Sequence, residues 1–341
     1  MTARSVRALA LALLLGAAAA ASAQDVQEAQ QPAAAAEADA PAEVVRVVGK
    51  RPGPGLWKIS RDGHVLWVFG AHAPLPQAMR WRADEVEGVI AQSQEYLAPP
   101  AISAKLGFFG AMTALPFAVG VKNIPDGAVL RDVLPSDVYA RWQQLKHKYI
   151  GDDAAIERER PIFVADTLFT KGLEQAGLSP RPDVRRAIEQ IVKKHKVRQT
   201  YSDVQVPMDS PVKMLRDFKK SGLDDVACFS ATLERLETDL DAMRSRASAW
   251  SMGDVDAMAK LGYVDNKAAC RMAMMNGAFV KDRAELLGME ARMRANWLAN
   301  AEKALTANAS TFAVLQMTDL LDAKGLLAAL KERGYAVEAP Q

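Results

Sequence analysis

Residues 55–76 read GLWKISRDGHVLWVFGAHAPLP, and this stretch decides the fold more than any other part of the chain. Two β-prone runs flank Arg61-Asp62-Gly63, and Asp-Gly between such runs is the usual signal of a tight hairpin turn. The second run, Val65 to Phe69, is apolar on both faces. This pattern predicts a hairpin whose second strand is central in a sheet and covered on both sides.

The C-terminal residues 310–338 return to the same kind of structure. The apolar run Thr311 to Met317 predicts another strand of the sheet. Residues 322–333 have the spacing of an amphipathic helix, and Gly334 follows as its stop. Tyr335 to Ala339 predicts a last strand. The chain is therefore expected to close with a strand-helix-strand unit.

Between these ends the apolar residues recur mostly at helical spacing, as they do from Val226 to Met243. Glu95 to Ala98 predicts a strand before this helical region, and Val197 to Tyr201 predicts the only strand within it. The sequence therefore predicts an α/β fold. We expect a mixed central sheet with an N-terminal hairpin, a large helical insertion over about 102–308, and the C-terminal strand-helix-strand.

The first 23 residues have the pattern of a secretory signal peptide: a basic start, an apolar run from Ala8 to Ala21, and a small-residue cleavage signal. The alternative is an uncleaved N-terminal anchor. We expect cleavage after Ala23 and export to the periplasm. Residues 24–54 are rich in Ala, Pro, Glu and Gln, which predicts a disordered tether before a folded domain over 55–341.

The charge balance argues against a nucleic-acid partner. The chain has 43 Lys and Arg residues against 41 Asp and Glu residues, and removal of residues 1–23, with their two Arg, leaves 41 of each. Leu106 to Val121 carries no charge and is broken by Gly and Pro, which predicts a buried cap over the sheet. The alternative is contact with a membrane surface, against which the lack of a basic face argues.

The chain has two cysteines, Cys228 and Cys270, and both fall in segments with helical spacing. In an oxidising compartment such a pair can persist as a disulfide, which would join two helices. The alternative is two buried free thiols. We expect the disulfide because the expected compartment permits it.

The two ends of the domain together resemble the TraB/GumN family, the bacterial relatives of the Tiki-type metal-dependent proteases. The matching residues are the hairpin, Gly70, Leu75-Pro76 and Trp81 at the front, and residues 312–315 and 325–338 at the back. The resemblance implies the fold of a metal-assisted hydrolase. In such a site two imidazoles and a carboxylate at adjacent strand ends hold a divalent cation, which polarises a carbonyl or activates water.

The first family motif, of the Gly-Thr-x-His type, is altered in this chain. With Leu75-Pro76 kept in register, Gly70 matches the motif Gly and Ala73 stands where the family has its His. His72 is one residue early, and one residue on a strand is a change of face. We therefore expect His72 to point away from the shared site.

The other motif positions are altered as well. The Glu that closes the next strand in the family falls at about Pro99, and the second motif His falls on Asp319. The Arg-Asn pair of the family's long helix falls near Glu290-Ala291, followed by Arg292. The apolar frame around each position is kept while its polar residue is replaced.

We therefore expect an exported, catalytically degenerate protein without a cofactor, which binds an unknown periplasmic protein or peptide or acts as an envelope-associated factor. The alternative is a metal-dependent hydrolase, a peptidase or an esterase, that uses zinc or manganese in a rearranged site. In that site His72 would be ligand or base, Asp319 a ligand and Arg292 an electrostatic stabiliser, with Glu95 as further help.

Overall fold

The structure, a computed structural model, describes residues 54–340 with gaps at 78, 80, 82, 106–107, 182, 208–209, 222, 224, 263–268, 271, 274–279 and 281–285. The chain divides into two units, Met1–Gly49 and Lys50–Gln341. The expected signal peptide and all but the last residue of the expected tether lie outside the described residues, so both stay predictions.

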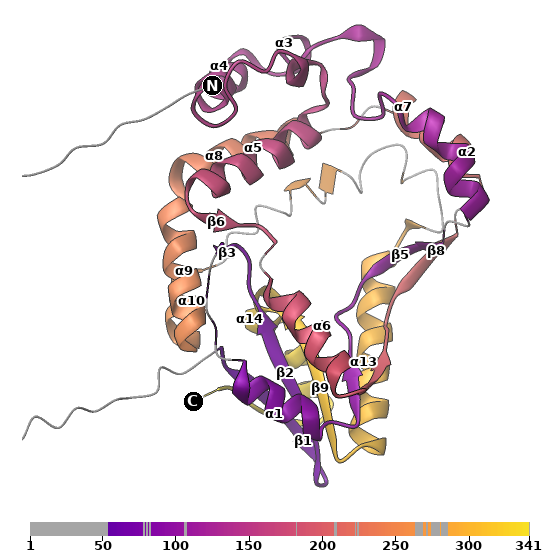
Figure 1. The fold of residues 1–341 in the computed structure, drawn as a ribbon, viewed down its shortest axis with the longest axis vertical. Helices are drawn as coiled ribbons and strands as arrows, with labels where there is room; N and C mark the ends of the chain where they lie inside the picture. The colour runs from indigo at the N-terminus through magenta and orange to yellow at the C-terminus, as the bar shows by residue number, and fades with distance from the viewer. Residues whose placement is uncertain are drawn as a thin grey trace, which may run out of the picture. The chain divides into compact units, whose positions relative to one another are not determined.

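A six-stranded mixed sheet lies in the unit Lys50–Gln341, in the order β10-β1-β2-β9-β4-β7 (Figure 1). The pairs β10–β1 and β1–β2 are antiparallel, whereas β2–β9, β9–β4 and β4–β7 are parallel. The expected mixed α/β fold is therefore confirmed. The strands of this sheet are β1 (Leu56–Arg61), β2 (His64–Ala71), β4 (Glu95–Leu97), β7 (Arg198–Thr200), β9 (Ser310–Gln316) and β10 (Ala336–Glu338).

The hairpin forms where the sequence predicts it. Asp62 and Gly63 connect β1 to β2 with φ angles of 53° and 85°, and a two-residue turn of this hand needs positive φ at both positions. β2 then lies between β1 and β9, and its residues Leu66, Val68 and Phe69 are fully buried. The apolar sequence of β2 is explained by its place inside the sheet.

Helices pack on this sheet and bury its apolar side chains. α1 (Asp84–Gln92) contacts α6 (Val184–Lys194), and Figure 1 shows both beside the strands. α13 (Met289–Ala307) packs on β2, and α15 (Leu326–Glu332) contacts α13 and β10. Together they enclose the larger of the apolar cores, which includes Ile90, Ile188, Trp297, Phe312 and Leu330.

A second apolar core lies inside the helical insertion. It is enclosed by α4 (Ser136–Tyr149), α5 (Pro161–Gln175) and α8 (Val226–Thr238), and the rings of Trp142 and Phe229 meet there with centroids 5.6 Å apart. α9 (Leu240–Met252) follows α8 after a break at Asp239. The remaining short helices of the insertion are η1 (Pro125–Gly127), α3 (Leu130–Val133), η2 (Ala155–Arg158) and α10 (Val255–Leu261).

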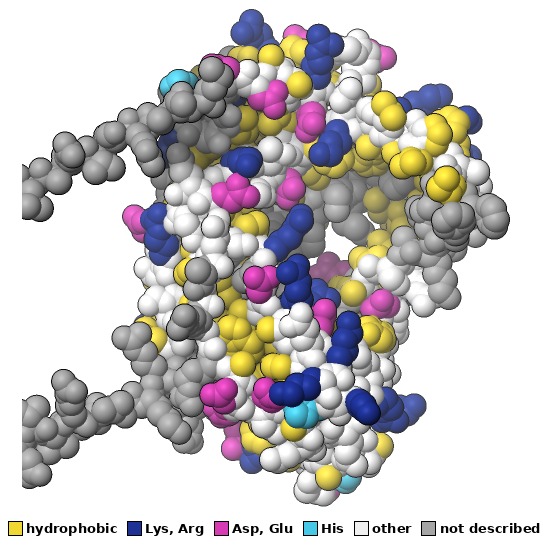
Figure 2. Space-filling model, in the orientation of Figure 1, with side chains coloured by type: hydrophobic (Ala, Val, Ile, Leu, Met, Phe, Trp, Pro, Cys, Tyr) yellow, Lys and Arg dark blue, Asp and Glu magenta, His cyan; other side chains and the backbone are white. Residues whose placement is uncertain are grey.

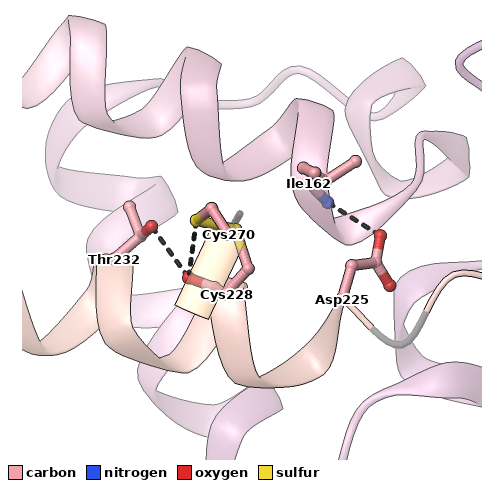
Figure 3. Close-up of a disulfide and its surroundings, with 5 residues drawn as sticks. All are labelled: Ile162, Asp225, Cys228, Thr232 and Cys270. Atoms are coloured by element: carbon pink, nitrogen blue, oxygen red, sulfur yellow. Dashed lines mark hydrogen bonds between the residues drawn. A yellow bond between two sulfur atoms is a disulfide. The ribbon is translucent and has the colours of Figure 1, made fainter. Parts of the chain in front are cut away.

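A disulfide joins Cys228 to Cys270, with their Cα atoms 4.4 Å apart (Figure 3). The expected bridge is confirmed and the free-thiol alternative is wrong. Cys228 is a buried residue of α8, and residues 269–270 are helical. Beside the bridge, the hydroxyl of Thr232 donates a 2.9 Å hydrogen bond to the carbonyl oxygen of Cys228. The bridge therefore ties a distant segment of the chain to the second core.

The insertion contains more strands than the sequence predicts. β5 (Ile102–Lys105) pairs with β8 (Val204–Pro207), and β3 (Leu75–Pro76), before the insertion, pairs with β6 (Leu178–Ser179). The expectation of a single strand within the insertion is therefore wrong. Strands of two to four residues are too short to show an alternating pattern, and only their tertiary partners define them.

The helix expected over 322–333 forms as α15, four residues later than expected, and an additional short helix precedes it. α14 (Met317–Leu321) begins directly after β9, and α15 begins after Gly325. A Cβ atom on Gly325 would collide with the backbone carbonyl oxygen of Asp319 and lie 2.8 Å from that of Asp322. Only glycine permits this close turn, which periodicity alone does not reveal.

The expectation of a buried cap over the sheet is also wrong. α2 (Phe108–Ala118) packs on α7 (Pro211–Lys220), and the side chains of Met112, Leu115 and Val119 are 57%, 66% and 76% exposed. The composition marked an apolar segment, but it did not specify which side chains find partners. No helix in the described part of the chain is long and apolar enough to span a bilayer.

Candidate functional site

Three neighbouring parallel strands end at one edge of the sheet. Ala71, the last residue of β2, is the Cα partner of Gln316, the last residue of β9. Leu97, the last residue of β4, is the partner of Ala313 in the same strand β9. The loops that follow β2, β9 and β4 therefore leave the sheet side by side, at the carboxyl edge where open α/β sheets place their ligands.

The three substituted motif positions follow these strand ends. Ala73 stands two residues after β2, and Pro99 stands two residues after β4. Asp319 lies on α14, which begins directly after β9. Neither Ala73 nor Pro99 has a side-chain atom that can donate or accept a hydrogen bond. Of the three positions, only Asp319 brings a polar side chain to the edge.

His72 lies at the same edge and is buried, with 5% of the residue exposed. Two other histidines have clear structural contacts. Nδ1 of His64 is 2.8 Å from the carbonyl oxygen of Asn308, and Nε2 of His195 is 2.8 Å from the carboxylate of Glu87. His147 lies on α4 in the helical insertion, so His72 is the histidine that remains as the candidate for this site.

Asp319 occupies surroundings that disfavour its negative charge. Burial raises the pKa of its carboxyl group, although the charge of Arg294 and a backbone hydrogen bond from Gln316 act in the opposite direction. The close turn at Gly325 packs directly against the backbone of Asp319. Arg294 is therefore the cationic neighbour of the Asp319 carboxyl group.

Arg294 is the arginine of α13 whose charge acts on Asp319. Arg292 is exposed, and its guanidinium donates a long hydrogen bond of 3.5 Å to the carbonyl oxygen of Leu287. Arg294 is half-buried and donates a 2.7 Å hydrogen bond to the carbonyl oxygen of Lys324, just before α15. Arg294 stands three residues before the buried Trp297, so helical spacing was the signal that could have identified it.

Glu95 lies toward the opposite edge of the sheet, so the expectation that it assists this site is wrong. It is the first residue of β4 and the partner of Thr311, whereas Asp319 follows the far end of β9. Burial is the strongest single influence on the pKa of Glu95 and acts to raise it. The hydrogen bonds to the carboxylate together outweigh burial, so the net pKa of Glu95 is lowered. The donors are the side chains of Thr200, Asn308 and Arg198.

The donor atoms at the strand-end edge do not fit a closed divalent-metal site. Zinc sites use three or four protein ligands. At the edge His72 brings an imidazole and Asp319 a carboxylate, and the charges of Asp322 and Glu290 also act on Asp319, while Ala73 and Pro99 offer no ligand atom. Within the described ranges, no group of three or more His, Cys, Asp or Glu side chains is arranged to hold an ion.

Residues 55–339 match the model of the TraB/PrgY/gumN family, a span that includes the hairpin, the insertion and the C-terminal strands. The chain belongs to the TraB/PrgY/gumN family. The resemblance seen at the two ends of the sequence is therefore confirmed over nearly the whole described domain. Comparison with curated proteins and with solved structures gave no match.

In this TraB/PrgY/gumN protein the motif residue Gly70 is explained by packing. A Cβ atom on Gly70 would collide with the sulfur of Met317 and come within 2.9 Å of Leu320 and Trp57. The absence of a side chain at Gly70 thus lets α14 lie over the end of β2. The backbone frame of the family motif serves the fold and does not depend on the motif's polar residues.

A cavity of about 350 Å³ lies within the helical insertion of this TraB/PrgY/gumN protein. This volume lies within the range of ligand pockets. The residues around it carry both signs of charge, and Arg244 is held there by a 2.7 Å ion pair with Asp241. The lining comes from α4, α5, α8 and α9 and includes Lys148, Gln175, Leu236, Glu237, Asp241 and Arg244.

Proposed function

We propose that this TraB/PrgY/gumN protein is exported to the periplasm, has lost hydrolytic catalysis, and acts by binding a periplasmic protein or peptide, or as an envelope-associated factor. One observation carries the proposal. The edge where β2, β9 and β4 end together keeps its packing, but its motif positions hold Ala73, Pro99 and Asp319. Three replacements at one edge remove most of the donors that a hydrolytic metal would need.

The helical insertion supplies a binding surface. The cavity between α4, α5, α8 and α9 is lined by Lys148 and Arg244 as well as by Glu237 and Asp241. A lining with both charges suits a peptide, whose backbone and side chains offer donors and acceptors together. The half-buried Leu240 in the same lining adds an apolar surface for an uncharged side chain of the bound peptide.

A metal titration tests the loss of catalysis. The chain from Gln24 to Gln341 is titrated with Zn²⁺, Mn²⁺ and Co²⁺ while its thermal midpoint is followed. A metal ion that binds only the folded state would raise the thermal midpoint. Because we expect no metal site, we expect no saturable shift of the midpoint at stoichiometric metal. A tight stoichiometric shift that Asp319→Ala removes would contradict the proposal.

The alternative function is a peptidase or esterase with a rearranged site. The raised pKa of Asp319 favours it, since a carboxyl group with a raised pKa is typical of a general acid or base. His72 lies at the same edge of the sheet. In this alternative Arg294, in place of Arg292, is the electrostatic stabiliser. His72→Ala and Asp319→Ala would each abolish hydrolysis of a peptide or ester substrate while the protein stays folded. Full turnover by either variant would exclude this alternative.

A further inference from the structure

The outer face of α2 is apolar and open to solvent. Met112 and Leu115 stand three residues apart on α2, which places them on one face, and Val119 follows directly after the helix ends at Ala118. These side chains are 57%, 66% and 76% exposed, while Ala114 between them is buried. Single exposed apolar residues are common, but two on one face of a helix without any charged residue, with Val119 exposed directly after it, indicate a contact surface.

α7 places basic side chains beside this face. It carries four basic residues and one acid, a net charge of +3, and the acid Asp217 forms a 2.9 Å ion pair with Lys213. The guanidinium of Arg216 lies over the Phe117 ring at 4.5 Å. Lys219 donates a 2.6 Å hydrogen bond to the carbonyl oxygen of Val119. Two of the four cations of α7, Arg216 and Lys219, are therefore held at the end of α2.

Figure 2 shows the result at the upper right of the view, where apolar side chains gather with Lys and Arg beside them over α2 and α7. Residues 106–121 carry no basic residue, and by themselves they lack the charges that favour contact with a membrane surface. The tertiary structure removes that objection, since α7 brings the missing charges from about a hundred residues further along the chain.

We propose that α2 and α7 form a docking surface for an anionic phospholipid bilayer. Met112, Leu115 and Val119 enter the boundary between headgroups and acyl chains, and the basic residues of α7 contact the lipid phosphates. An apolar helix face with basic residues at its side is the arrangement that binds such interfaces. Each Lys or Arg close to an anionic bilayer adds attraction, and the net charge of α7 has the right sign.

The exposure of the three side chains favours a bilayer over a protein partner. Proteins capture apolar anchors in grooves and pockets, which enclose the side chain. Leu115 and Val119, which are 66% and 76% exposed, project from the molecule. Projecting apolar side chains match a fluid bilayer, which needs no complementary shape.

Vesicle flotation tests the proposal with the chain from Gln24 to Gln341, which lacks the expected leader and keeps the whole described domain. One set of vesicles contains phosphatidylcholine with phosphatidylglycerol, and the other contains phosphatidylcholine alone. We expect the protein to float with the anionic vesicles and to be released by salt. Protein that stays in the soluble fraction with both sets would overturn the proposal.

Variants identify the surface. Leu115→Glu with Val119→Glu places two carboxylates on the docking face, so we expect flotation to fall by about tenfold or more. The matched control is Leu261→Glu on α10, where a 40% exposed leucine receives the same change and flotation stays as in the wild type. Lys220→Gln should weaken binding to anionic vesicles by about fivefold. Unchanged flotation of the double Glu variant would overturn the proposal.

A second copy of the chain is the competing occupant of this face. If light scattering shows a dimer that the double Glu variant converts to a monomer, and neither form floats, the proposal is wrong and the face is a dimer interface. Circular dichroism confirms that each variant is folded. Metal binding at Asp319 is measured separately, so failure of the docking surface leaves the proposed loss of catalysis to be decided by its own titration.

Discussion

The indole nitrogen of Trp250 donates a 2.7 Å hydrogen bond to the carbonyl oxygen of Gly70, and this contact joins α9 to the end of β2. The two residues are 180 positions apart in the sequence. The ring of Phe69 meets Trp250 edge-on, with centroids 6.0 Å apart. The helical insertion is therefore attached, through α9, to the carboxyl edge of the sheet where β2 ends.

Replacement of Trp250 separates the hydrogen bond from the packing. Trp250→Phe keeps a ring against Phe69 but leaves the buried carbonyl of Gly70 without its donor, so we expect a loss of about 1–3 kcal/mol in the free energy of unfolding. Trp250→Ala also creates a cavity and should cost about 3–5 kcal/mol. Urea denaturation measures both values. A Phe variant as stable as the wild type would show that the hydrogen bond contributes nothing.

Gly325→Ala should destabilise the C-terminal unit. The new methyl group would meet the backbone carbonyl of Asp319, which cannot turn away as a side chain can, and we expect a cost of about 1–3 kcal/mol. Gly88→Ala on α1 is the matched control. A Cβ atom at Gly88 meets nothing within 4 Å, so the better helix former should stabilise by about 0.5–1 kcal/mol. Equal effects at the two positions would contradict the packing of α14 on α15.

Glu95 should make the stability of the protein depend on acid. Its pKa is lowered in the folded state, so its carboxylate stabilises the fold above the usual carboxyl range, and this contribution is lost as the pH falls through the lowered pKa. Glu95→Gln should cost about 1–3 kcal/mol at pH 7 and progressively less in acid. Unfolding curves of both proteins from neutral to acidic pH measure the difference. A cost that stays constant with pH would exclude a role for the ionised group.

Asp319 should act in the opposite direction. Its pKa is raised in the folded state, so its ionised form opposes folding above the usual Asp range and costs nothing once the pH falls below that range. Asp319→Asn keeps an acceptor for the backbone of Gln316 and removes the charge. The variant should therefore be more stable than the wild type at pH 7 and equal to it in acid. A variant that is less stable at pH 7 would show that the charge of Arg294 dominates over burial.

The disulfide should contribute directly to stability. Cys228 and Cys270 are 42 residues apart in the sequence. A closed loop of that length lowers the conformational entropy of the unfolded chain and so adds about 2–4 kcal/mol to the free energy of unfolding. The double variant Cys228→Ala with Cys270→Ala should lose that amount in urea denaturation. A reducing agent should lower the midpoint of the wild type and leave the double variant unchanged. An unchanged wild type in reductant would contradict the prediction.

The sequence predicted those parts of the fold that depend on neighbouring residues. Asp62 and Gly63 specify the hairpin because only residues that accept positive φ permit the turn. Gly334 likewise ends α15 with a φ of 85°. The family resemblance added that the strands on either side of the insertion belong to one sheet. The candidate site followed from that resemblance, and residue spacing within α13 would have pointed to Arg294.

The sequence by itself determined the hairpin, the strands β4 and β9, and the family, because each depends on residue identity or local backbone geometry. Only the tertiary structure decided that α2 is exposed, that Glu95 lies toward the far edge of the sheet, that Cys228 meets Cys270, and that α7 supplies cations to α2. These outcomes depend on which distant segments pack together. Burial and charge pairing depend on contacts between distant residues, and the order of residues in the sequence does not show which distant residues come into contact.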